Sequence, residues 1–91
     1  MKCVRCLVSG RVQGVWFRET TRRKAVALGV SGAAVNLPDG RVEVTACGDA
    51  AAVARLCAWL WEGSPLSHVE RVECPPLDAG EVVPVHGFVT R

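Results

Sequence analysis

The sequence predicts a small α+β domain, a two-layer sandwich in which two helices cover one face of a mainly antiparallel sheet of four or five strands. Two observations predict it. At 91 residues and 49% hydrophobic composition, the chain fits one compact domain spanning residues 1–91. Its periodicity runs strand, helix, strand, strand, helix, strand, with one further strand possible, and this βαββαβ order is the split βαβ pattern.

The first strand and helix flank a loop that contains two glycines. Residues 3–9 alternate in polarity, which is typical of a strand with one buried face. Residues 18–28 contain no Gly or Pro, and Gly29 follows them where a left-handed residue ends a helix. The inner face of this helix is expected to consist of residues at helical spacing: Phe17, Thr21, Ala25 and Leu28.

A hairpin and a second helix follow. Residues 30–36 lead into a Leu-Pro-Asp-Gly turn at 37–40, and residues 41–46 alternate as the returning strand. Asp49 is placed to cap the second helix. Its apolar stripe recurs at helical spacing: Val53, Leu56, Cys57 and Leu60. Two tryptophans flank the stripe and are expected to pack: Trp59 and Trp61.

The C-terminal part is less regular. Residues 68–74 are predicted to form a strand, residues 75–80 a turn-rich connection, and residues 82–90 a final edge strand. His68 and His86 have no spacing that indicates a catalytic triad or a metal site. We expect both histidines at the surface or at a strand edge.

The charge distribution favours a small anionic ligand. Net charge is only +2, but residues 1–45 carry eight basic and three acidic side chains, and the rest carry three basic and six acidic. Such a field suits a small anion at least as well as a polyanion. The three basic residues at 22–24 are expected to form a solvated helix face. RNA binding by stacking on sheet aromatics is disfavoured, because the chain has no Tyr and two Phe.

Cysteine usage and hydropathy predict a cytoplasmic protein that does not enter the membrane. No apolar stretch approaches the roughly 20 residues of a spanning helix, and the N-terminus lacks signal-peptide character. Five cysteines, an odd number, argue against a secreted disulfide framework. Cys3 and Cys6 have the spacing of a metal or redox pair, but positions three apart in a strand point to opposite faces. We therefore expect buried or edge thiols and no metal site.

The most unusual segment is Gly-Arg-Val-Gln-Gly-Val-Trp-Phe-Arg at residues 10–18. A tight loop that opens a helix presents consecutive backbone N–H groups and the positive end of the helix dipole to an anion. Gly10 and Gly14 permit close backbone approach. Arg18 is placed to bind two phosphate oxygens with its planar guanidinium. The alternative, on these residues alone, is a structural turn followed by a solvated arginine.

Two segments resemble a known family. VSGRVQGVWFR at residues 8–18 resembles the complete first signature of the acylphosphatases, and GAAVNLPDGRVEVTACG at residues 32–48 resembles most of the second. AVALG at residues 25–29 fits the pattern between them. The resemblance implies a ferredoxin-like fold and hydrolysis of the carboxyl–phosphate bond of small acyl phosphates to a carboxylate and inorganic phosphate. It implies no metal and no cofactor.

The resemblance also implies the site residues. Arg18 matches the substrate-binding arginine, and Asn36 matches the asparagine that orients the attacking water. The loop whose backbone amides would hold the phosphate comprises Arg11, Val12, Gln13, Gly14, Val15, Trp16 and Phe17. An acyl phosphate is already activated, so such a site needs charge neutralisation and an in-line water, with the substrate's phosphate accepting the proton. Without the first signature, the favoured interpretation of Asn36 would be an ordinary residue before a turn, where Asn is common.

Two departures from the family pattern leave an alternative open. The family usually has an aromatic residue at the place of Ala33 and a basic or polar one at the place of Val35. Loss of the aromatic contact would cost about 1–3 kcal/mol unless a tryptophan fills the space. The alternative is a non-catalytic phosphate-binding or protein-interaction module on the same fold. Otherwise we expect a monomer that binds a small acyl phosphate, with no nucleic acid or membrane as partner.

Overall fold

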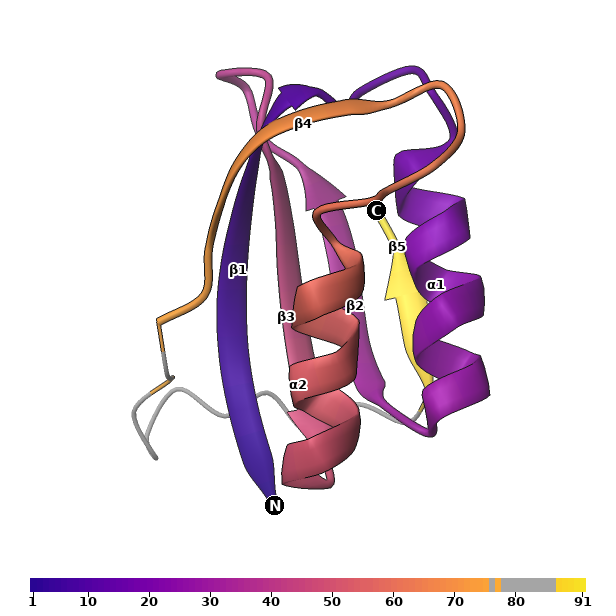
Figure 1. Ribbon diagram of the computed structural model, residues 1–91, viewed down its shortest axis with the longest axis vertical. Helices are drawn as coiled ribbons and strands as arrows, with labels where there is room; N and C mark the ends of the chain where they lie inside the picture. The colour runs from indigo at the N-terminus through magenta and orange to yellow at the C-terminus, as the bar shows by residue number, and fades with distance from the viewer. Residues whose placement is uncertain (76, 78–86) are drawn as a thin grey trace.

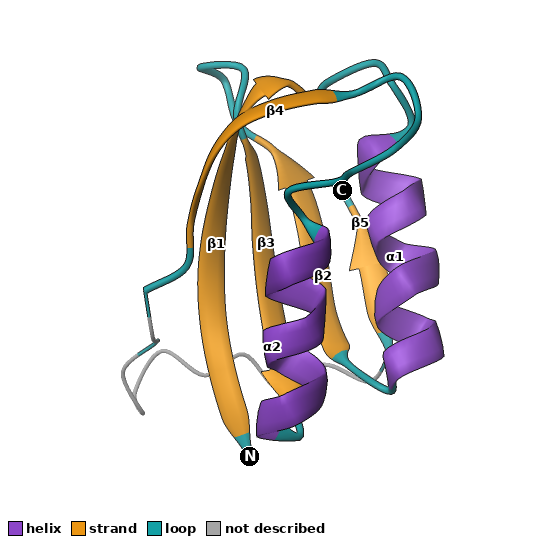
Figure 2. Ribbon diagram, viewed as in Figure 1, coloured by secondary structure: helices purple, strands orange, loops and turns teal. Residues whose placement is uncertain are grey.

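The computed structural model describes residues 1–75, 77 and 87–91 (Figure 1). Within these residues it contains seven elements: β1 (Lys2–Arg11), α1 (Phe17–Leu28), β2 (Ser31–Asn36), β3 (Val42–Gly48), α2 (Ala50–Trp59), β4 (His68–Glu73) and β5 (Phe88–Thr90). Figure 2 shows both helices on the same face of one twisted sheet. The predicted α+β class, the βαββαβ order and the two-layer arrangement are confirmed.

The sheet has the strand order β4-β1-β3-β2-β5. β1 pairs antiparallel with β3 and β4, and β2 pairs antiparallel with β3, whereas β2 and β5 are parallel. The predicted final strand at 82–90 is described only from Phe88 to Thr90, and residues 82–86, including His86, lie outside the described residues. The same holds for most of the predicted connection at 75–80. The prediction that residues 1–91 form one domain stays a prediction.

The core lies between the helices and the sheet, as the periodicity predicts. β1 buries alternate residues, with Cys6 and Val8 fully covered. Along α1 the predicted inner face is buried at its first three positions and partly buried at Leu28. α2 begins at an Asp49 cap, whose carboxylate accepts from two backbone N–H groups, and its stripe packs on the sheet. His68 is exposed on the edge strand β4, as expected.

The two tryptophans of the second helix region behave differently. The Trp59 ring stacks on Phe17 with ring centroids 6.3 Å apart, which confirms its packing role. Trp61 is 54% exposed, so the prediction that it packs is wrong. The physical reason is that α2 ends at Trp59, and beyond that residue helical spacing no longer determines which way a side chain faces.

Four of the five cysteines form disulfides, which corrects the expectation of free thiols. Cys3 lies directly opposite Cys47 in the β1–β3 pairing and is bonded to it, and Cys6 is bonded to Cys74 just after β4. Strand register brings each pair together, and register cannot be deduced from the spacing of cysteines along the chain.

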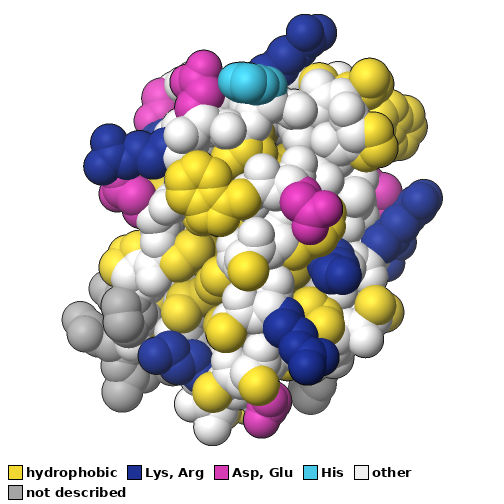
Figure 3. Space-filling model, viewed as in Figure 1, with side chains coloured by type: hydrophobic (Ala, Val, Ile, Leu, Met, Phe, Trp, Pro, Cys, Tyr) yellow, Lys and Arg dark blue, Asp and Glu magenta, His cyan; other side chains and the backbone are white. Residues whose placement is uncertain are grey.

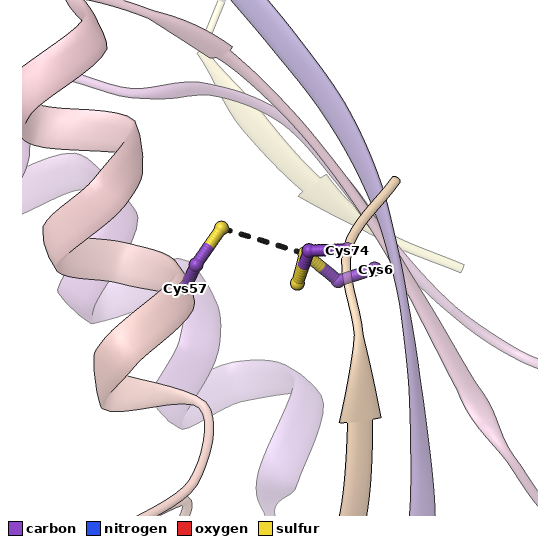
Figure 4. A group of neighbouring side chains, drawn as sticks. All are labelled: Cys6, Cys57 and Cys74. Atoms are coloured by element: carbon purple, nitrogen blue, oxygen red, sulfur yellow. Dashed lines mark hydrogen bonds between the residues drawn. A yellow bond between two sulfur atoms is a disulfide. The ribbon is translucent and has the colours of Figure 1, made fainter. Parts of the chain in front are cut away.

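The remaining thiol lies beside the second disulfide. Cys57 points from α2 toward this disulfide, with its sulfur 3.5 Å from that of Cys6 (Figure 4). The sulfurs of Cys6, Cys57 and Cys74 all lie within 4.8 Å of one another. Partial burial raises the pKa of the Cys57 thiol, so at neutral pH the sulfur is mainly protonated and weakly nucleophilic.

Candidate active site

A cavity of about 390 Å³ opens where the loop after β1 meets the start of α1 and the end of β5. It is lined by Val12, Gly14, Trp16, Phe17, Arg18, Glu19 and Thr90. Six of these seven residues belong to the sequence segment 12–19. The segment that the sequence analysis singled out therefore forms most of one concave surface.

The backbone of this loop turns through conformations that glycine favours. Gly10 has φ +122° at a register shift between β1 and β4, and a Cβ there would lie 2.2 Å from the His68 carbonyl oxygen. Gly14 has φ +73°. Val12, between these turns, and Val15 and Phe17, after them, have side chains buried in the core. The two glycines therefore let the loop bend, and the buried side chains anchor it to the core.

The hydrogen bonds of the loop leave its N–H groups available. The Val15 carbonyl accepts from the buried Ser64 hydroxyl at 2.6 Å, and the Trp16 carbonyl accepts from the Thr20 hydroxyl at 2.8 Å and its N–H at 3.0 Å. No backbone N–H of residues 13–16 donates to any residue that the structure describes. The carbonyls are thus engaged by the protein, while four consecutive donors remain for an anion.

Arg18 places its guanidinium in the same cavity. The guanidinium donates to the main-chain oxygen of Arg91, and it pairs with no Asp or Glu side chain among the described residues. The nearby Glu19 carboxylate is taken by two other arginines, Arg22 at 2.6 Å and Arg23 at 3.0 Å. These bonds lower the pKa of Glu19 to about 2. On the helix-covered face in Figure 3, basic side chains gather over α1.

Asn36 lies at the end of β2 and does not line the cavity, but the structure connects it to the loop. Gln13 donates from its amide nitrogen to the carbonyl oxygens of Leu37, at 2.8 Å, and Arg41, at 3.0 Å. The loop is therefore fastened to the β2–β3 turn one residue beyond Asn36. The amide oxygen of Asn36 is buried and has no donor among the described residues. A buried acceptor without a partner is a position where a water molecule is expected.

The predicted site residues thus fall into four groups. Five line the cavity: Val12, Gly14, Trp16, Phe17 and Arg18. Gln13 fastens the loop, and Val15 anchors it in the core. Arg11 is an exposed residue at the end of β1, opposite His68, and does not line the cavity. Asn36 stands apart, as described above.

Sequence reasoning missed Ser64, Thr90 and Arg91. Each reaches the loop or the cavity from a segment more than forty residues away along the chain. Ser64 lies in the Gly-Ser-Pro segment after α2, and these residue types indicate the end of a helix but no contact with the loop. Its hydrogen bond to Val15 of the loop depends on tertiary packing and has no pattern in the sequence.

The two departures from the family pattern lie away from this cavity. Ala33 and Val35 line a separate groove of about 160 Å³ together with Arg5, Gly32, Glu43, Thr45 and Arg91. They alternate with the buried Ala34, so they face the side of the sheet opposite the helices. No tryptophan lines this groove. The space left by Ala33 is therefore an open groove, which the three tryptophans do not fill.

Fold and site together define a small α+β sandwich with one cavity suited to an anion such as phosphate. The cavity combines one arginine with a loop whose N–H groups have no acceptor among the described residues. Comparison with known proteins identifies the family. The acylphosphatase family model matches residues 4–90. The chain is 52% identical over 90 residues to an acylphosphatase of Xanthomonas oryzae pv. oryzae, with 99% of each chain covered. The chain belongs to the acylphosphatase family, and its activity is acylphosphatase activity.

Solved structures agree with this result. An acylphosphatase from Coxiella burnetii superposes with a TM-score of 0.90 at 40% identity, covering 99% of this chain and 92% of that one. An acylphosphatase from Bacillus subtilis gives a TM-score of 0.93 at 32% identity, covering 100% and 99%. No helix in the described part of the chain is long and apolar enough to cross a bilayer.

Proposed function

We propose that the loop of residues 11–17 and Arg18 hold the phosphate of a small acyl phosphate while Asn36 orients the water that attacks it. The unpartnered N–H groups of residues 13–16 bind phosphoryl oxygens, and the Arg18 guanidinium neutralises their charge. The buried amide oxygen of Asn36 accepts a hydrogen bond from the water. The products are a carboxylate and inorganic phosphate.

The proton of the attacking water goes to the substrate's own phosphate. The cavity has one carboxylate, that of Glu19, and its pKa of about 2 makes it a poor proton acceptor at neutral pH. The acyl phosphate is a mixed anhydride whose leaving group is a stable carboxylate, so a strong base is not needed. Positioning and charge neutralisation supply the catalysis.

One observation carries this assignment: Arg18 pairs with no Asp or Glu side chain among the described residues, and it lines the same cavity as a loop whose N–H groups have no acceptor in the described structure. We expect Arg18→Ala and Asn36→Ala each to lower turnover of acetyl phosphate by roughly 10²–10³-fold, the effect of removing one preorganised donor. Phosphate release is measured with a chelator present, which is expected to leave the wild-type rate unchanged. Lys24→Ala is the matched control and should keep the wild-type rate, because Lys24 lies on the same helix but neither lines this cavity nor pairs with Glu19. Wild-type rates in both site variants would refute the assignment.

The structure removes the main argument for the non-catalytic alternative. It rested on Ala33 and Val35, which line the groove on the other face of the sheet. It predicts that inorganic phosphate binds to the protein in an Arg18-dependent way while acetyl phosphate is hydrolysed no faster than in buffer. The same assay decides between the two, because only an enzyme shows a rate that depends on protein concentration.

We further propose that the protein is a monomer. Sedimentation across a range of protein concentrations tests it, and a concentration-dependent dimer would contradict it. The cytoplasmic location also stays a proposal. The two disulfides argue against it, because disulfides persist mainly in oxidising compartments. Cell fractionation decides between the two indications.

A further inference from the structure

Trp16 combines three properties that rarely occur together. It is 73% exposed, although tryptophan is the largest apolar side chain. Its backbone has φ +65° and ψ +15°, and it is the one residue other than glycine with positive φ among the described residues. Finally, it lines the cavity that contains Arg18. For a bulky side chain this backbone conformation is strained, and strained residues concentrate at functional sites.

The surrounding structure fixes the indole in this position. The neighbours on both sides, Val15 and Phe17, are buried in the core and anchor the chain before and after it. Its carbonyl oxygen is held by the hydroxyl and the N–H of Thr20. With the main chain held at three adjacent residues, the exposed side chain stands at the rim of the cavity and not in the core.

The cavity has room for more than the phosphate group. Its volume of about 390 Å³ falls within the range of sites that hold small organic ligands. Arg18 and the loop N–H groups occupy its polar part. The remaining lining includes Val12, Phe17 and the indole of Trp16, which offers a flat apolar surface. An acyl group attached to a phosphate at Arg18 would have this surface within the same cavity.

We propose that Trp16 is the acyl-binding residue of this enzyme and that its indole favours acyl phosphates with an apolar, and above all an aromatic, acyl group. The proposal rests on the site assignment given under Proposed function. It predicts selectivity between substrates that share the same phosphate and differ only in the acyl group. Stacking of two aromatic groups gains binding energy beyond the burial of their area.

The test compares benzoyl phosphate with acetyl phosphate in wild type, Trp16→Ala and Trp16→Phe. We expect Trp16→Ala to lower the ratio of kcat/KM for benzoyl phosphate over acetyl phosphate by roughly 2- to 12-fold, the worth of one aromatic pair. Most of that change should appear in KM. Because the ratio divides out any general damage to the loop, it reports on the acyl group alone. Trp16→Phe keeps an aromatic surface and should restore most of the ratio.

The matched control is Trp61→Ala, since Trp61 is also exposed but lies beyond α2 and lines no part of this cavity. It should leave the ratio unchanged. An unchanged ratio in Trp16→Ala, or an equal change in Trp61→Ala, overturns the proposal. Failure of the site assignment looks different: Arg18→Ala would then hydrolyse both substrates at the wild-type rate, whatever the ratio in the Trp16 variants.

Discussion

Glu19 shows how one residue keeps the site electropositive. Its carboxylate accepts hydrogen bonds from Arg22 and Arg23 on the next turn of α1, and these bonds lower its pKa from 4.5 to about 2. Because the Glu19 carboxylate pairs with these two arginines, it does not pair with Arg18, which lines the same cavity. The three-residue basic run that the sequence analysis placed on a solvated helix face is therefore partly an ion-pair cluster.

This arrangement predicts a specific dependence of stability on acid. Because the pKa of Glu19 is lower in the folded protein, the ion pairs stabilise the fold above about pH 4.5, and that contribution is lost as the pH falls toward about 2. Glu19→Gln should therefore show a weaker loss of unfolding free energy between pH 5 and pH 2 than wild type. Urea unfolding at a series of pH values measures it. Glu62→Gln, which removes an exposed carboxylate without an ion pair in the described structure, is the control, and equal slopes in both variants would exclude the ion-pair explanation.

The position of a side chain was predictable where helical or strand periodicity determines its burial. It was not predictable where contacts with distant parts of the chain determine it. Val53 and Leu56 lie in the core because helical spacing places them there. Trp61 has the same apolar character but follows the end of α2, and it is exposed. The partner of Arg18 is the Arg91 carbonyl, 73 residues further along, which no local pattern indicates.

At the scale of elements, the segment after α2 braces the phosphate loop. Gly63 has φ +67°, and a Cβ there would lie 2.4 Å from the Ser67 hydroxyl and 2.9 Å from the Phe17 ring. This tight turn brings the buried Ser64 hydroxyl to the Val15 carbonyl. A second hydroxyl, that of Ser67, donates to the Ser64 carbonyl and completes the turn. Two segments that flank different helices thus meet beneath the cavity.

We expect Ser64→Ala to weaken both the fold and the site. It leaves the buried Val15 carbonyl without its donor, at a cost of roughly 1–3 kcal/mol of unfolding free energy. Since that bond also turns the carbonyl away from the cavity, kcat/KM for acetyl phosphate should fall as well. The measurements are urea unfolding and phosphate release. Ser67→Ala removes a neighbouring bond that does not touch the loop, and it should cost less stability and leave kcat/KM unchanged. If Ser64→Ala loses stability but keeps the wild-type kcat/KM, the hydrogen bond from Ser64 to Val15 does not shape the site.

Elements were predicted well where periodicity is long and poorly where strands are short. The first helix and the first three strands appear within about two residues of the expected bounds, and the second helix begins after the expected Asp49 cap, because burial on one face forces a regular pattern. β5 has three described residues and pairs in parallel with β2, a partner that comes more than fifty residues earlier. A strand of that length has too few alternations to define its own ends.

At the scale of the whole molecule, β1 is the strand that ties the fold together. It is paired on both sides, carries one end of each disulfide, and leads directly into the phosphate loop. The disulfides join it to Cys47 of β3 and to Cys74 after β4, over 44 and 68 residues of sequence. Sequence patterns predict strands and their faces, but they do not state which strands are neighbours. That is why the strands were predictable and the sulfur pairing was not.

The two bridges predict a large effect of reduction on stability. Closing loops of this length restricts the unfolded chain by about 4 kcal/mol each on the chain-entropy argument, and measured values are typically about 2–4 kcal/mol. We therefore expect a reducing phosphine to lower the unfolding free energy of the wild type by several kcal/mol, as measured by urea unfolding. The denatured protein should titrate one thiol before reduction, that of Cys57, and five after it.

The triple variant Cys3→Ser/Cys6→Ser/Cys57→Ser separates the bridges from other effects of the reductant. It can form neither bond, nor a new one among the three neighbouring sulfurs, so its unfolding curve should not respond to the phosphine and should resemble that of reduced wild type. Cys57→Ser keeps both bonds and should respond as wild type does. Five titratable thiols in the untreated protein would show that the strands alone hold β1 in place. In that case the close approach of three sulfurs reflects packing of α2 and β4 on β1, and the fold would suit a reducing compartment without any loss of stability.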